Sequence, residues 1–180
     1  YIVMYHYVRR VRKSKYQNLK ALEFDEFKRQ IDFFLKNFNI LNVEDFIQIL
    51  KTKKIKKKPS ILLTFDDGYK DHYNFVFKYL KKKKISGCFY PPASVIENNQ
   101  ILDVNKIHFL LEKKIDLDKL FDVSSKALDK KFGFSLKKFL SINNSKIKKL
   151  KNRYDNHKIV VFKSLIQKLL PKNMRNFLIT

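Results

Sequence analysis

The sequence lacks the features of a small disulfide-rich protein and of a membrane-spanning one. Cys88 is its only cysteine, so a disulfide within the chain is excluded, which fits a reducing compartment. Apolar runs stay well short of the roughly 20 residues that cross a bilayer, and no signal-peptide pattern opens the chain. We therefore expect a cytoplasmic location and no transmembrane segment.

Acidic residues are scarce as well: 17 Asp and Glu stand against 40 Lys and Arg, which gives a net charge of +23. One interpretation is an electrostatic partner such as nucleic acid, an anionic membrane surface or an acidic polymer. The second is the codon bias of an AT-rich genome, because Lys, Asn, Ile and Phe are abundant together while Arg is scarce beside Lys. We favour the second interpretation, codon bias, and expect the charge to be spread over loops and helix ends. We also expect no specific nucleic-acid binding.

Apolar and aromatic residues are plentiful enough for a packed core. Hydrophobic residues make up 44% of the 180 residues, with 17 Phe and 9 Tyr but no Trp. The chain opens at Tyr1 without a Met and closes at Thr180 inside an apolar stretch. We expect it to be part of a longer protein, with its oligomeric state open.

The first half alternates predicted strands with predicted helices. Strands are predicted at residues 2–7, 61–65 and 87–90, and a shorter one at 40–43. A helix capped by Asp25 should carry an apolar face, and further helices are expected at 44–50 and 75–84. Such alternation predicts an α/β fold whose three main strands are parallel neighbours.

The second half changes in character after residue 102. Helical segments are predicted near residues 107–111, 136–140 and 160–170, and loops at 143–145 and 152–156. We therefore divide the chain into an α/β part, 1–102, and a helical insertion or lobe, 103–180.

One segment carries a specific chemical signal: Thr64-Phe65-Asp66-Asp67-Gly68-Tyr69. It places two carboxylates just past the end of a strand that is apolar throughout, where α/β folds hold catalytic groups. Adjacent residues in such a turn point in different directions. One carboxylate can therefore bind a metal while its neighbour accepts a proton from water, and Gly68 permits the sharp turn.

Three alternatives fit this segment less well. Asp and Gly are common in ordinary strand-to-helix turns. However, the Leu-Leu-Thr-Phe before the pair and the Tyr after it make the segment more specific. Aspartyl-phosphate hydrolases require Asp-x-Asp, and calcium loops require acidic residues at alternating positions. Neither pattern is present.

With this segment the sequence resembles the polysaccharide deacetylase family, also called the NodB-homology family of carbohydrate esterases. The resemblance rests on Met-Tyr-His-Tyr-Val at 4–8, Leu-Thr-Phe-Asp-Asp-Gly-Tyr at 63–69 and Gly-Cys-Phe-Tyr at 87–90. It covers about the first hundred residues. It implies that the α/β part is the N-terminal part of a distorted (β/α) barrel, with the helical insertion following it.

The resemblance also implies roles for the two carboxylates. Asp66 is similar to the family's general base, and Asp67 to the first ligand of its divalent metal, usually zinc. The family adds two histidines from a His-Ser/Thr-x-x-His motif, which is absent here, as are its Arg-x-Pro-Tyr motif and its distal catalytic histidine. Either these lie beyond Thr180 or the chain is an incomplete or inactive copy.

The histidines present have different expected roles. His6 is interpreted as a core histidine, although its place at a strand end brings it near the site. We expect His72 on a helix surface, His108 on a helix of the insertion and His157 in a polar loop, none of these three as a metal ligand.

The implied activity is the hydrolysis of N-acetyl groups from amino sugars of a polysaccharide or glycan precursor, with a bound metal, zinc by resemblance. The alternatives are a non-catalytic fragment that binds carbohydrate or a partner and, supported by charge alone, a basic nucleic-acid-binding protein.

Overall fold

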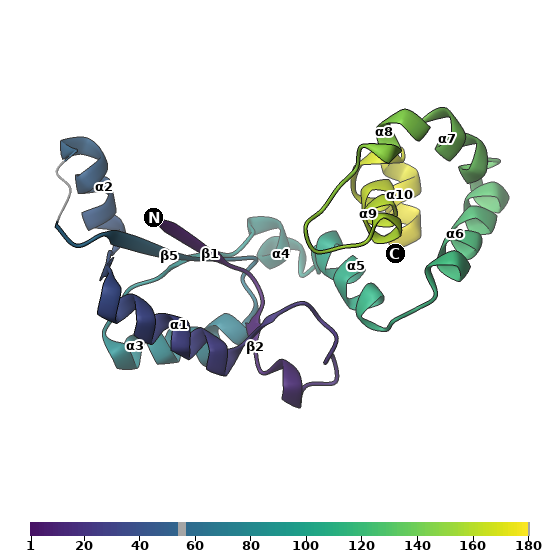
Figure 1. Ribbon diagram of the computed structural model, residues 1–180. Helices are drawn as coiled ribbons and strands as arrows, with labels where there is room; N and C mark the ends of the chain where they lie inside the picture. The colour runs from purple at the N-terminus through teal and green to yellow at the C-terminus, as the bar shows by residue number, and fades with distance from the viewer. Residues whose placement is uncertain (54–56, 180) are drawn as a thin grey trace. The chain divides into compact units, whose positions relative to one another are not determined.

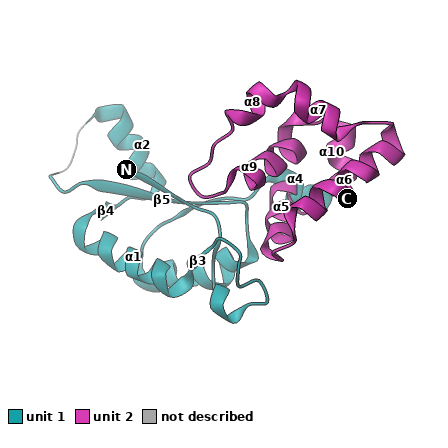
Figure 2. Ribbon diagram, turned by 45° about the vertical axis from the view of Figure 1, so that its right-hand side comes forward, with its two compact units in different colours: residues 1–100 teal, residues 101–180 magenta. Residues whose placement is uncertain are grey.

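The computed structural model describes residues 1–53 and 57–179. The lysine runs of the sequence also predict a loop at residues 51–58, and its residues 54–56 lie outside the described residues. The chain divides into two compact units, Tyr1–Gln100 and Ile101–Thr180 (Figure 2). This division lies close to the predicted one at residue 102. The interpretation of the second part as an insertion stays a prediction.

The first unit alternates short strands with helices, as predicted from the pattern (Figure 1). Its strands are β1 (Ile2–Tyr5), β2 (Val8–Arg9), β3 (Leu22–Glu23), β4 (Asn39–Ile40), β5 (Ser60–Asp66) and β6 (Cys88–Tyr90). Its helices are η1 (Val11–Lys13), α1 (Phe24–Asn37), α2 (Val43–Thr52), the π-helix η2 (His72–Phe77), α3 (Lys78–Lys83) and α4 (Ala93–Asn98).

Strand β5 is the centre of the main sheet. It pairs in parallel with β1 on one side and with β4 and β6 along its length, in the order β1-β5-β4 with β6 also on β5. The predicted parallel arrangement of the three main strands is therefore confirmed. Tyr5 lies beside Phe65, and Asp66 beside Tyr90, so the carboxyl ends of β1, β5 and β6 meet at one edge.

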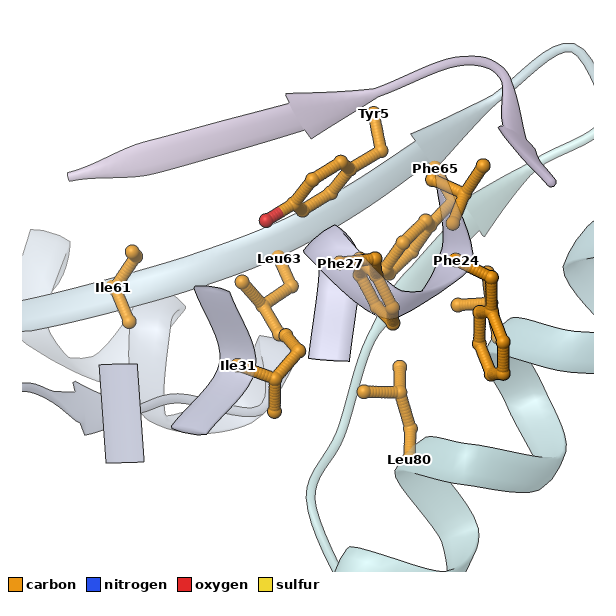
Figure 3. Close-up of a cluster of buried hydrophobic side chains, with 10 residues drawn as sticks. Tyr5, Phe24, Phe27, Ile31, Ile61, Leu63, Phe65 and Leu80 are labelled. Carbon is orange, nitrogen blue, oxygen red and sulfur yellow. The ribbon is translucent and has the colours of Figure 1, made fainter. Parts of the chain in front are cut away.

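Both faces of β5 are covered, as its unbroken apolar sequence predicts. Ile61, Leu63 and Phe65 pack against α1 and α3 (Figure 3). Leu62 packs on the opposite face with Cys88 and with Phe46 and Ile49 of α2. Cys88 itself is buried. Packing on both faces thus gives the end of β5 a rigid support.

Helix α1 begins earlier than predicted, and the predicted Asp25 cap is wrong. The helix starts at Phe24, its N-cap residue is Glu23, and Asp25 lies in the first turn. There its charge suits the positive end of the helix dipole. The predicted apolar face is present around Phe27 and Ile31, both fully buried.

Helices are the only regular secondary structure among the described residues of the second unit. It contains α5 (Asp103–Glu112), α6 (Leu117–Phe132), α7 (Leu136–Ile142), α8 (Asn144–Lys148), α9 (His157–Ser164), the π-helix η3 (Leu165–Leu169) and α10 (Lys172–Ile179). The helical character was predicted, but the loop expected at 143–145 is wrong, because α8 begins at Asn144. The unit has its own buried clusters, which include Leu128, Leu165 and Ile107.

The first unit is thus an α/β unit with a parallel sheet. The four strands of the main sheet form an open sheet among residues 1–53 and 57–100. Closure into the distorted barrel implied by the resemblance is not seen in this part of the chain. No described helix is long and apolar enough to cross a membrane.

Candidate active site

Asp66 and Asp67 lie at the carboxyl end of β5, where the chain turns sharply. Asp66 is the last residue of the strand, and Asp67 follows with a φ of 72°. Gly68 continues the turn with a φ of +63°, and a Cβ there would stand 2.7 Å from the Pro91 Cβ. Glycine is therefore required at this position both by its backbone conformation and by the close approach of Pro91.

His6 lies beside Asp66, one residue beyond the end of β1. Its Nε2 is 3.9 Å from Asp66 Oδ2, and 45% of the His6 side chain and 31% of the Asp66 side chain are exposed. The interpretation of His6 as a core histidine is wrong, whereas its predicted nearness to the site is seen. The parallel register explains this placement, since Tyr5 pairs with Phe65 and the next residues emerge together.

Asp67 is held by a tyrosine whose role no sequence pattern indicated. The Tyr69 hydroxyl donates to Asp67 Oδ2 at 2.6 Å, and the Tyr69 ring stacks on Tyr7 with centroids 4.4 Å apart. Burial, followed by the hydrogen bond to Asp67, raises the pKa of the Tyr69 hydroxyl. Tyr69 therefore remains a proton donor near neutral pH and fixes the orientation of the Asp67 carboxylate.

His72 lies beneath the site, and its predicted place on a helix surface is wrong. Only 3% of the residue is exposed. Its Nε2–H donates to the His6 carbonyl oxygen at 2.5 Å, because a carbonyl can only accept. Burial lowers the pKa of His72, so the ring is neutral at pH 7. His72 thereby anchors the backbone that carries His6.

The remaining two histidines lie in the second unit. His108 is on α5, as predicted. His157 is the first residue of α9, so its predicted place in a loop is wrong, and its Nε2 lies 3.1 Å from the Ile147 carbonyl oxygen.

A pocket of about 330 Å³ is lined in part by Gly68 and Tyr69, the two residues that follow Asp66 and Asp67 in the turn. Its lining is almost entirely apolar or aromatic and comes from the turn after β5, from η2 and from the end of β6: Gly68, Tyr69, His72, Tyr73, Phe77, Phe89 and Pro91. A concave aromatic surface beside convergent polar groups is the usual form of a small-molecule site.

The comparisons with known proteins bear on this site. The family model described as polysaccharide deacetylase matches residues 53–117, which contain Asp66 and Asp67. This segment is therefore similar to part of a polysaccharide deacetylase domain. The match agrees with the resemblance noted in the sequence, to a family of hydrolase enzymes.

A solved structure is similar to the chain as well. It is the Streptococcus pyogenes deacetylase PplD in complex with acetate, with 19% sequence identity and a TM-score of 0.47. The likeness covers 72% of this chain and 67% of that one. No curated protein matches the chain.

Among the described residues, the donors for a metal are few. No group of three or more His, Cys, Asp or Glu side chains that could hold a metal ion occurs in residues 1–53 and 57–179. A catalytic zinc takes three protein ligands, so this set does not fit a complete zinc site. Asp67, fixed by Tyr69, is the side chain best prepared to supply one of them.

Proposed function

We propose that this chain is part of a deacetylase that hydrolyses the N-acetyl group of amino sugars in a polysaccharide or glycan precursor. One observation carries the proposal. Two adjacent carboxylates emerge at the carboxyl end of the buried central strand β5, inside the segment that matches the polysaccharide deacetylase family. The open sheet of the first unit would then be the N-terminal part of the family's distorted barrel.

Asp66 is proposed as the general base. Its carboxylate is partly exposed, so water can reach it, and it lies at the edge where catalytic groups of parallel sheets gather. No hydrogen bond from a protein donor to its oxygens is seen among the described residues, apart from its approach to His6. Such a carboxylate is free to accept a proton from the water that attacks the acetyl carbonyl.

Asp67 is proposed as a metal ligand and not as a base. Tyr69 donates to its Oδ2, which leaves Oδ1 as the oxygen for a cation. A divalent metal, zinc by analogy with the family, would polarise the acetyl carbonyl and lower the pKa of the attacking water when bound. Since the described residues lack a complete ligand set, we expect this chain alone to bind zinc weakly.

The aromatic pocket supports a sugar substrate. Tyr73, Phe77 and Phe89 present partly exposed rings in the pocket that Gly68 and Tyr69, directly after the carboxylates, also line. The C–H face of a pyranose ring packs on such rings, because the face of an aromatic ring is negative and C–H groups are weakly positive. A sugar bound there would bring an N-acetyl substituent towards Asp66 and Asp67.

The test measures acetate released from N-acetylglucosamine oligomers by the natural protein that contains this chain. Asp66→Asn should abolish turnover, leave zinc bound and leave the circular dichroism spectrum unchanged. Asp45→Asn, which changes an exposed carboxylate on α2, is the matched control and should retain full activity. Full activity of the Asp66→Asn protein would refute the proposed base. Glycan binding without any acetate release from the unmodified protein would instead favour a non-catalytic binding role.

A further inference from the structure

The positive charge of the second unit is unevenly distributed along the sequence. Residues 103–129 contain six acidic and five basic residues, whereas the 24 residues from Lys130 to Arg153 contain nine basic residues and no acidic one. A uniform codon bias would raise lysine in both segments alike. The separation therefore calls for a physical cause beyond composition.

We refer to residues 130–153 as the basic segment; it comprises the end of α6, helices α7 and α8, and the start of the loop before α9 (Figure 1). Leu136 and Ile147 anchor its two short helices in the buried core of the unit. All nine cationic side chains are exposed: Lys130, Lys131, Lys137, Lys138, Lys146, Lys148, Lys149, Lys151 and Arg153. The cationic side chains therefore take no part in packing α7 and α8 against the core.

The cations also take no part in the ion pairs seen in the described part of this unit. Those pairs use lysines outside the basic segment: Lys106, Lys126, Lys158 and Lys163. Nine like charges on one short stretch repel one another, which costs stability. An anionic surface outside the protein would remove this cost.

An exposed apolar side chain stands among these charges. Ile142, the last residue of α7, is 71% exposed. It lies four residues after Lys138 and so on the same face of the helix. Tyr154, directly after the basic segment, is 73% exposed, and the Arg153 guanidinium lies 5.8 Å from its ring centroid.

We propose that the face formed by α7 and α8 binds the surface of an anionic lipid bilayer, with Ile142 inserted among the acyl chains. Clusters of lysines beside an exposed apolar residue are the pattern that peripheral membrane proteins use, and exposed tyrosines suit the headgroup layer. Eight of the nine cations are Lys, whose point charges match a diffuse anionic surface better than the bidentate contacts that nucleic-acid readout requires.

The test uses co-sedimentation of the 180-residue chain with vesicles of phosphatidylcholine containing phosphatidylglycerol, and with vesicles of phosphatidylcholine alone. We expect binding to the anionic vesicles only, and weaker binding as salt rises. The quadruple variant Lys137→Gln, Lys138→Gln, Lys146→Gln and Lys149→Gln should lose affinity by about a hundredfold or more, since each lysine near an anionic surface contributes roughly fivefold.

The matched control removes the same number of charges from the first unit: Lys51→Gln, Lys53→Gln, Lys82→Gln and Lys84→Gln, all exposed. It should reduce affinity by less than about threefold, an effect of net charge alone. An equal loss in both variants would show that binding follows total charge and would overturn the proposed face.

Ile142→Ser separates membrane insertion from simple polyanion binding. It should weaken binding to anionic vesicles by roughly tenfold, the effect of withdrawing one large apolar side chain from hydrocarbon. Its affinity for duplex DNA at the same salt concentration should not change. If Ile142→Ser binds vesicles as well as the unmodified chain, or if duplex DNA binds more tightly than the vesicles, the membrane proposal is wrong.

Discussion

Substitution of Gly68 by alanine tests whether the turn that carries the carboxylates is as constrained as its geometry implies. The backbone has a φ of +63°, which costs a residue with a Cβ about 1–2 kcal/mol. The new Cβ would also stand 2.7 Å from Pro91 Cβ and 3.0 Å from Pro91 Cα, and such overpacking typically costs about 1–3 kcal/mol. Gly68→Ala should therefore lower the free energy of unfolding of the first unit by about 2–5 kcal/mol.

Gly133→Ala supplies the matched control. Gly133 ends α6 with a φ of +59°, but a Cβ there would meet no atom within 4 Å, so only the backbone cost of about 1–2 kcal/mol applies. Urea unfolding followed by tyrosine fluorescence reports on the first unit, which holds eight of the nine tyrosines. The far-ultraviolet helical signal comes from both units, so the unfolding of the second unit is the part of this signal that tyrosine fluorescence does not follow. If Gly68→Ala lowers the free energy of unfolding by no more than Gly133→Ala does, the proposed steric conflict with Pro91 is refuted.

Three further outcomes are expected. Because burial lowers the pKa of His72 in the folded state, the contribution of His72 to stability is fully present above about pH 6.5 and is lost as the pH falls below that. His72→Gln should remove this part of the pH dependence of the free energy of unfolding. An unchanged dependence on pH would contradict the prediction. Tyr69→Phe should lower deacetylase activity of the natural protein by about 10- to 100-fold, whereas Tyr79→Phe, remote from the carboxylates, should not. The 180-residue chain should bind zinc substoichiometrically in dialysis and release little acetate, and stoichiometric zinc would point to His6 as a further ligand.

Much of the sheet could be predicted because it depends on local patterns. Residues 61–65 are apolar without interruption, and this pattern alone indicates a strand covered on both faces. Strand–helix alternation then implies a parallel sheet, and a parallel sheet places the residues after β5 at its functional edge. The position of Asp66 and Asp67 followed from these steps, without any knowledge of tertiary contacts.

What could not be predicted depends on contacts between distant segments. His72 lies in a π-helix, whose wider turn departs from the helical period used to assign faces, and its hydrogen-bond partner is 66 residues away at His6. Tyr69 lies in a turn, where the periodicity of apolar residues does not indicate which way a side chain points. The roles missed at this site, those of Tyr69 and His72, are therefore to position other groups of the site.

The surroundings of the two adjacent carboxylates support their different proposed roles. Asp67 accepts a hydrogen bond from a tyrosine that burial keeps protonated, so its orientation is fixed and one oxygen is already engaged. Asp66 lies towards solvent beside His6, whose backbone is anchored in turn by His72. A metal ligand benefits from a fixed orientation, while a general base must exchange protons with water. The same pair with the roles exchanged would need Asp66 to be rigidly held and Asp67 to be open, which is the opposite of the observed arrangement.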